Sequence, residues 1–415
     1  MIRTLIRVRW LLAFGPVLVA GCKDNGPKEL GPPAQIVVVA GSPQTALAGT
    51  NLATPISVSV RDANGRGVPD QSVTFTIIAG GGSFPGNTTT ATATTDDGGT
   101  ATAPAWRLGK SDVAQTMRAQ TAGVTNDNIS VGVQSDYEIT IRFFGPPMTA
   151  AQQTLFTNAA ARISAIITGD LVNVNALNSG IDPDTTGCQT TGQPVLNEII
   201  DDVLIYASIR DIDGPGQILA QAGACFVRGH PTQTDPPHAA IGTMQFDAAD
   251  IGALSGSGSL QDVITHEMMH VVGLGVLWNS SRTLLQNEGS ADPRYSGTQG
   301  IQGCRSIGGS IACATTVPVE NTGGEGTADS HWRESTFNTE LMTGFLDAGA
   351  NPISLMTIGA LADLGFTVNE AAADEYSIFL NAFRANSLAG PRVKWENIIR
   401  PGGVIENGKV RPLRP

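Results

Sequence analysis

The amino-acid sequence predicts a multidomain protein, in which an N-terminal all-β sandwich is followed by an α+β domain. Residues 34–135 contain short runs in which apolar and polar residues alternate, and turn sequences such as "DANGRG" separate these runs. From residue 136 onwards, strand-like runs are mixed with stretches in which apolar residues recur at helical spacing. The chain has 415 residues, which is more than one ordinary domain requires.

In the first unit, strands are predicted at "QIVVVAG", "ISVSVRD", "SVTFTIIAG", "TATATT" and "ISVGVQ". Two longer stretches, "PISVSVRDANGRGVPDQSVTFTIIAGGGSF" and "TTDDGGTATAPAWRLG", resemble the bacterial immunoglobulin-like domains of the invasin and intimin type. The resemblance implies an immunoglobulin-like sandwich over residues 34–135 that serves as a spacer or as an adhesive module. Such domains do not need a disulfide, which agrees with the lack of cysteine in this stretch.

The α+β domain is expected over residues 136–385. Strands are predicted at "YEITIRFF", "DDVLIYASIRDID" and "AIGTMQFDAADI". A helix is predicted after the capping residue Thr149, because apolar side chains follow at helical spacing: Leu155, Phe156, Ala159, Ile163 and Ile166. The last residues, 386–415, are basic and rich in proline, which predicts a loosely packed tail.

The first residues predict export. Three arginines precede a short apolar run at residues 10–20, and "VAGC" follows directly. This pattern resembles a bacterial lipoprotein signal, which implies that residues 1–21 are removed and that Cys22 is lipidated. Residues 22–33 would then be a tether to the cell envelope, with Lys23 favouring the outer membrane. The alternative is an ordinary secretory signal with an incidental cysteine.

The other cysteines predict two disulfides, because their number is even and export places them in an oxidising compartment. They are Cys188, Cys225, Cys304 and Cys313. Pairing Cys304 with Cys313 and Cys188 with Cys225 is the simplest of three possible connectivities. None of the cysteines has the CxxC spacing of a zinc knuckle or redox site.

The stretch "THEMMHVVGLG" predicts a metal site on a helix. His266 and His270 are four residues apart, so their imidazoles lie on the same helical face and can bind one ion. Glu267 is placed to take a proton from a metal-activated water and pass it to a leaving amine. The helix is expected to begin near Ser259, with Asp262 completing a capping box, and to end at Gly273 or Gly275.

A catalytic zinc site needs a third protein ligand. The remaining histidines are His230, His238 and His331, and the first two flank "PTQTDPP", a segment that predicts a surface loop. "HEMMHVVG" matches the HExxHxxG pattern of metzincin peptidases. However, Val276 stands where most of that clan has its third histidine. The ligand must therefore come from elsewhere in the chain.

The paired motifs "HEMMHVVGLG" and "HWRESTFNTELM" resemble the leishmanolysin family, in which the third zinc histidine follows a long insertion. The resemblance covers roughly residues 136–370. It implies that His331 is the third ligand and that Met342 forms the turn beneath one zinc ion, with Met356 as the alternative for that turn. The chain departs from the family in having few cysteines. No cysteine-switch propeptide is recognisable, so activation by propeptide removal is not supported.

Together these patterns predict an exported, membrane-tethered zinc metalloendopeptidase that cleaves peptide bonds in proteins. An extended substrate is expected to pair antiparallel with an edge strand above the active-site helix. One alternative is a surface adhesin, in which the immunoglobulin-like unit binds and the metal domain is inactive. Another is a structural metal site with a fourth protein ligand. The formal net charge of −12 argues against a nucleic-acid partner.

Overall fold

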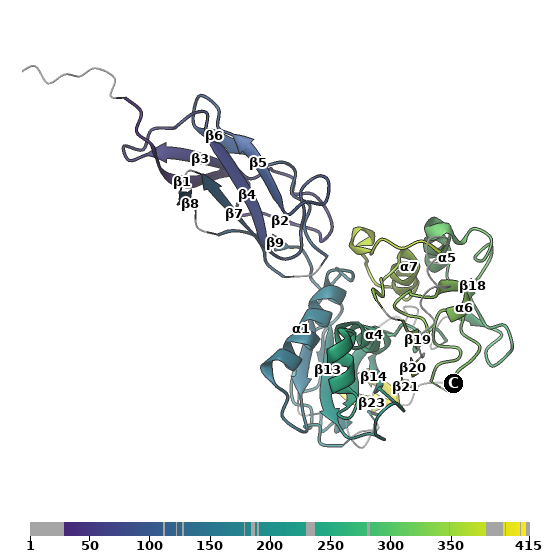
Figure 1. Ribbon diagram of the computed structural model, residues 1–415. Helices are drawn as coiled ribbons and strands as arrows, with labels where there is room; N and C mark the ends of the chain where they lie inside the picture. Colours follow the sequence, from purple (N-terminus) through teal and green to yellow (C-terminus); the bar gives the residue numbers. More distant parts are fainter. Residues whose placement is uncertain are drawn as a thin grey trace, which may run out of the picture.

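Figure 1 shows the computed structural model of the chain. It describes residues 29–110, 113–121, 123–126, 128–177, 179–183, 187–188, 191–229, 237–279, 283–324, 326–347, 349–378, 393–394, 396–406 and 408–411. The predicted signal sequence, Cys22 and most of the tether lie outside the described residues. Within the described residues, no helix is both long enough and apolar enough to cross a membrane.

The N-terminal unit consists of two β-sheets, drawn in purple and blue in Figure 1. The first sheet has the strand order β1 (Pro33–Ala40), β3 (Ser57–Asp62), β6 (Thr100–Thr102). The second sheet has the strand order β2 (Thr45–Ala46), β9 (Ile129–Val133), β7 (Gln115–Thr121), β4 (Ser72–Ala79), β5 (Thr90–Thr94). In the second sheet, β8 (Val124–Thr125) also pairs with β7. Alternate side chains of both sheets enter one core, where Val58 and Phe75 are fully buried. The five predicted strands are all present, whereas the immunoglobulin-like character of the unit stays a prediction.

The second unit is built on a seven-stranded mixed sheet. Its strands are β10 (Ile139–Phe143), β13 (Val203–Arg210), β15 (Ala239–Asp247), β14 (Ala220–Arg228), β22 (Gly403–Glu406) and β23 (Lys409–Arg411) in spatial order, with β21 (Glu396–Ile398) also paired to β14. Strands β10, β13 and β15 are parallel, and β14 runs antiparallel to β15. The central strands are buried on both faces, which explains their nearly continuous apolar sequences.

Two helices pack against each other in this unit, α1 (Ala150–Ser164) and α4 (Leu260–Val272), and α4 also packs on β14 and β15. Helix α1 begins as predicted: the Thr149 hydroxyl accepts from the Gln152 amide at 3.2 Å, and the Gln152 side chain accepts from the Thr149 amide at 2.8 Å. Phe156 of α1 meets Phe246 of β15 edge to face, with ring centroids 5.3 Å apart.

The capping box predicted for α4 is wrong. Ser259 makes no side-chain cap, and its φ of −88° and ψ of −8° are helical rather than extended. The reason is the preceding helix α3 (Ile251–Ser257), which leaves no extended residue before α4. The Asp262 carboxylate instead accepts from the Asn351 side chain at 3.0 Å.

The prediction of a loosely packed C-terminal tail is also wrong. Strands β21, β22 and β23 belong to the main sheet, and Ile399 and Ile405 are only 4% and 2% exposed. The sequence carried a signal for this, because "VIENGKVR" places Asn-Gly between two stretches of strand-forming residues. The nearby prolines outweighed that signal in the prediction.

The segment between α4 and residue 375 forms a region of short elements, drawn in green in Figure 1. These are β16 (Leu285–Gln286), β17 (Arg294–Tyr295), α5 (Thr298–Cys304), the π-helical turn η1 (Arg305–Gly309), β18 (Val317–Pro318), α6 (Glu334–Phe337), β19 (Phe345–Leu346), α7 (Leu355–Asp363) and the 3-10 turn η2 (Glu370–Ala372). Strand β19 pairs with β20 (Val393–Lys394), and β11 (Val174–Asn175) pairs with β12 (Ile199–Ile200). Met356, the alternative for the turn beneath the metal, is fully buried in α7.

The two units are joined by direct polar contacts. The Asn369 side chain donates to the Ala48 carbonyl at 2.8 Å, and the Arg162 side chain donates to the Lys110 carbonyl at 3.1 Å. Lys110 also forms an ion pair with Asp374 at 3.1 Å. Because these partners come from both units, the N-terminal unit is docked against the second unit as well as linked to it through the chain.

Candidate metal centre

Helix α4 carries His266 and His270 one turn apart, and both side chains are fully buried. The helix ends at Gly273, whose φ of +120° is outside the range that other residues adopt readily. At Gly275, an added Cβ would lie only 2.0 Å from the Ser330 carbonyl oxygen. The absence of a side chain at Gly275 therefore lets the backbone next to His331 approach the end of α4.

The structure brings His266, His270 and His331 together, although about sixty residues separate the motif on α4 from His331. The three Nε2 atoms form a nearly equilateral triangle: 3.0 Å between His266 and His270, 3.1 Å between His270 and His331, and 3.2 Å between His266 and His331. Nitrogens bound to one tetrahedral ion at about 2.0–2.1 Å lie about 3.3 Å apart. The triangle is therefore of the right size for three nitrogens that would hold one ion.

The other ring nitrogen of each histidine fixes its tautomer. His266 Nδ1 lies 2.7 Å from the Leu341 carbonyl oxygen, His270 Nδ1 lies 2.8 Å from that of Leu274, and His331 Nδ1 lies 2.8 Å from that of Thr327. A carbonyl oxygen only accepts, so each Nδ1 carries the hydrogen. In the neutral ring each Nε2 then presents a lone pair to the other two. Three lone pairs that face one another repel, whereas a shared cation would attract all three. The donor set therefore fits a metal ion.

Glu267 is also on α4, about 100° around the helix from His266. Its side chain is fully buried. A carboxylate one residue after His266 is the residue type that general-base chemistry requires.

Met342 lies in a tightly bonded turn, directly after Leu341, whose carbonyl bonds to His266. Its amide donates to the Glu340 carboxylate at 2.6 Å, and its carbonyl accepts from the Trp332 amide at 2.9 Å. The Glu340 carboxylate also accepts from the amide and the hydroxyl of Ser354, at 3.0 and 2.7 Å, and from the Thr357 hydroxyl. The Trp332 indole donates to Thr357 at 2.9 Å, so one network joins the turn to the residue after His331.

Glu340 is a residue whose importance the sequence alone did not indicate. Burial raises the pKa of its carboxyl group, and hydrogen bonds from Thr357 and Ser354 oppose that shift. The carboxylate fixes the backbone on both sides of Leu341, whose carbonyl orients His266. Glu340 therefore positions His266, a candidate metal ligand, through the backbone of Leu341.

We expect Glu340→Ala to lower the free energy of unfolding by about 3 kcal/mol, because several buried donors would lose their acceptor. Zinc affinity should fall about tenfold, because the carbonyl that orients His266 would no longer be held. Denaturant unfolding and zinc titration measure the two effects, with the more exposed Glu370→Ala as control. A variant with the stability and affinity of the parent would contradict this role.

The described residues contain two disulfides, which have the simplest of the three possible connectivities: Cys188 with Cys225, and Cys304 with Cys313. The first ties β14 to the segment between β11 and β12, and the second closes the turn after α5. Neither pair contributes to the histidine cluster.

His230 lies outside the described residues. His238 is buried against Phe366 with ring centroids 4.4 Å apart, so the prediction that it lies in a surface loop is wrong.

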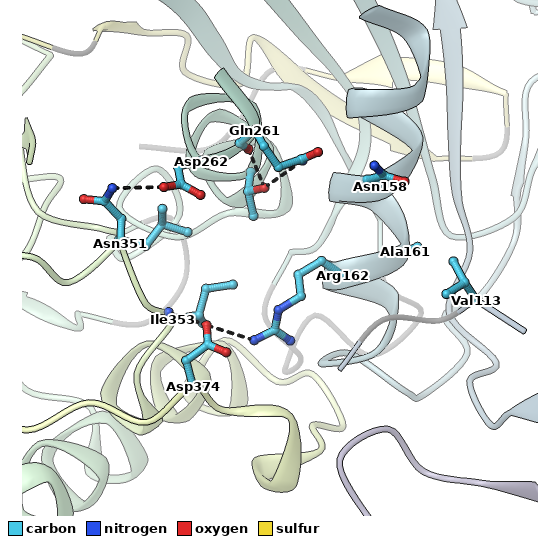
Figure 2. Close-up of a pocket in the computed structure, with 11 residues that line it drawn as sticks. Val113, Asn158, Ala161, Arg162, Gln261, Asp262, Asn351, Ile353 and Asp374 are labelled. Atoms are coloured by element: carbon cyan, nitrogen blue, oxygen red, sulfur yellow. Dashed lines mark hydrogen bonds and ion pairs between the residues drawn. The ribbon is translucent and has the colours of Figure 1, made fainter. Parts of the chain in front are cut away.

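A separate cavity of about 350 Å³ lies beside α4, where the two units meet (Figure 2). Val113 of the N-terminal unit lines it together with Arg162, Asp262, Asn351 and Asp374 of the second unit. Figure 2 shows the contact of Asn351 with Asp262 and the ion pair of Arg162 with Asp374, the latter 3.3 Å long. None of the three clustered histidines lines this cavity.

Comparison with known proteins finds similarity over the part of the chain that contains the cluster. Residues 193–382 match the leishmanolysin peptidase family. This leishmanolysin family domain contains all three clustered histidines, Glu267 and Met342, whereas the N-terminal unit lies outside the match. The chain is also 27% identical over 172 residues to a leishmanolysin of Leishmania donovani. That alignment covers 40% of the present chain and 27% of the relative, so the chain spans about a quarter of the relative's length.

Proposed function

We propose that residues 136–385 are a zinc metalloendopeptidase domain of the metzincin type, which hydrolyses peptide bonds in proteins. One observation carries the proposal: three buried imidazoles turn their Nε2 atoms toward one point, 3.0–3.2 Å apart. The match of residues 193–382 to leishmanolysin supports the same reaction class. In this proposal the chain is exported and tethered to the bacterial envelope through Cys22. The unit at 34–135 is an immunoglobulin-like spacer.

His266, His270 and His331 would hold the ion, and the carbonyls that accept from their Nδ1 atoms would keep the rings oriented. A zinc ion bound in this way supplies Lewis acidity that activates water and polarises a peptide carbonyl. Glu267 would take a proton from the attacking water and deliver it to the leaving amine. Met342 would form the floor of the site through packing.

Metal removal tests this function. We expect the purified protein to cleave casein, to lose this activity after treatment with a chelator, and to regain it when zinc is added back. The ion would be the source of the Lewis acidity, so loss of zinc should reduce cleavage to background. Cleavage measured with labelled casein, together with metal analysis of each sample, records the result. A magnesium addition serves as control, because magnesium prefers oxygen ligands.

Two outcomes would contradict the proposal. Chelator-resistant cleavage would show that the histidine cluster is not the catalytic site. A zinc-loaded protein that cleaves no protein substrate would favour the adhesin or a structural metal site, and a fourth protein ligand to the zinc would identify the latter.

A further inference from the structure

Strand β14 has its outer edge filled by the C-terminal segment of the same chain. The Ile399 amide donates to the Ala222 carbonyl at 2.8 Å, and the Gly402 amide donates to the Cys225 carbonyl at 2.9 Å. Further along, the Gly229 amide donates to the Ile405 carbonyl at 2.9 Å. Backbone groups on this edge of β14, which a docking peptide would need, are therefore already in use.

The position of β14 makes its outer edge the expected docking site of an extended substrate. β14 packs directly on α4, the helix that carries His266 and His270. Its inner edge is taken by β15, so only its outer edge is left for pairing with a peptide. A substrate that adds a strand to the sheet above α4 would pair along that edge.

The same C-terminal segment also contacts the other side of the metal centre. Strand β20 pairs with β19, which begins one residue after Gly344. A Cβ built on Gly344 would lie 3.8 Å from the Cβ of His331. Strand β20 therefore lies at the strand beside His331, and β21 lies at the strand that packs on α4. In Figure 1 the labels of β19, β20, β14 and β21 lie together between the two halves of this unit.

The direction of the segment is opposite to that expected of a substrate. Both β21 and β22 run parallel to β14, whereas the expected substrate runs antiparallel to it. Reversing a peptide exchanges the order of its carbonyl and amide groups along the cleft. A bound segment of this polarity therefore does not present a peptide bond to Glu267 in the productive orientation.

The edge is shaped for this segment. Gly223 has a φ of +154°, and a Cβ built on it would lie 1.9 Å from the Ile399 carbonyl oxygen, so only glycine permits this close approach. Ile399 and Ile405 are buried at 4% and 2% exposure. In this arrangement the three clustered histidines and Glu267 are at most 1% exposed.

We propose that residues 393–394 and 396–406 are an intramolecular occupant of the substrate edge of β14, bound in the non-productive direction. The edge is thus an acceptor for an extended peptide strand, and the parent cleaves its substrates slowly until the segment is displaced. This inference rests on the proposed peptidase function. Displacement needs no covalent step, because backbone hydrogen bonds and the packing of Ile399 and Ile405 hold the segment in place.

Gly402→Pro tests the inference, because proline removes the amide that bonds to Cys225 without removing a side chain. We expect its kcat/KM for casein to rise at least about tenfold over the zinc-loaded parent, which corresponds to a change of about 1.4 kcal/mol. Val410→Pro is the matched control. It lies on β23, which pairs with β22 and not with β14, and should leave kcat/KM unchanged.

A synthetic peptide with the sequence of residues 393–406 gives a second measurement. It should inhibit Gly402→Pro by raising KM, whereas a scrambled peptide should not. If circular dichroism shows that Gly402→Pro is not folded, the peptide is tested on the parent. It must then reduce the parent's residual cleavage by raising the KM for casein. If the parent cleaves casein as fast as Gly402→Pro and the peptide inhibits neither protein, the inference is wrong. The proposed peptidase function would not be affected by that result. Absence of chelator-sensitive cleavage in every variant would overturn both.

Discussion

Replacing Glu267 with alanine should abolish peptide-bond cleavage and leave zinc binding intact. The substitution removes the carboxylate that would accept the proton of the attacking water, and it changes none of the three histidines. Loss of a general base lowers kcat by about 10²–10⁴-fold. Because ground-state binding of substrate does not depend on proton transfer, we expect KM to change little. Cleavage of a quenched fluorescent peptide measures kcat and KM, and metal analysis measures the zinc content.

A buried carboxylate outside the cluster provides the control for this prediction. Glu334 is 3% exposed, lies on α6 and is not one of the predicted site residues. Glu334→Ala should retain a much larger part of the activity than Glu267→Ala when both are compared at equal folded concentration. If Glu267→Ala cleaves as fast as the parent, another group supplies the base and the assigned mechanism is wrong.

Local patterns predicted much of the fold because they reflect the burial of single elements. Alternation around Val58 and Phe75 predicted strands of the first unit, and Thr149 predicted the start of α1. Strand β14 was missed, since "AQAGACFVR" is rich in small residues and does not alternate clearly. Its strand character comes from tertiary pairing with β15 on one side and with the C-terminal strands on the other.

In the candidate site, too, local patterns predicted some features, and others depend on contacts between distant segments. The spacing of His266 and His270 follows from helix geometry, so the sequence alone predicts that the two rings share a face. His331 could be found only through the resemblance of its surrounding motif, because no local pattern encodes a contact across the intervening segment. The role of Gly275 and the network around Glu340 depend on distances between segments, and only the structure contains those distances.

The contribution of His331 should be visible in zinc binding itself. With His331→Ala, two imidazoles of one helix turn remain, and they cannot complete the three-ligand set of a catalytic zinc site. We expect zinc affinity to fall by more than about 100-fold, because altering even the hydrogen-bond partner of a ligand costs about 10–100-fold. Titration against a competing zinc indicator measures this change without any assay of cleavage.

His238→Gln is the matched control, because His238 is also buried but lies against Phe366 instead of in the cluster. Its zinc affinity should equal that of the parent, provided that circular dichroism shows both variants to be folded. In the metal-free protein, replacing His331 also removes one of three nitrogen lone pairs that repel each other. This relief of repulsion should partly offset the stability that the variant loses through poorer packing. If His331→Ala binds zinc as tightly as the parent, the third ligand lies elsewhere, and the triangle of Nε2 atoms is not the metal site.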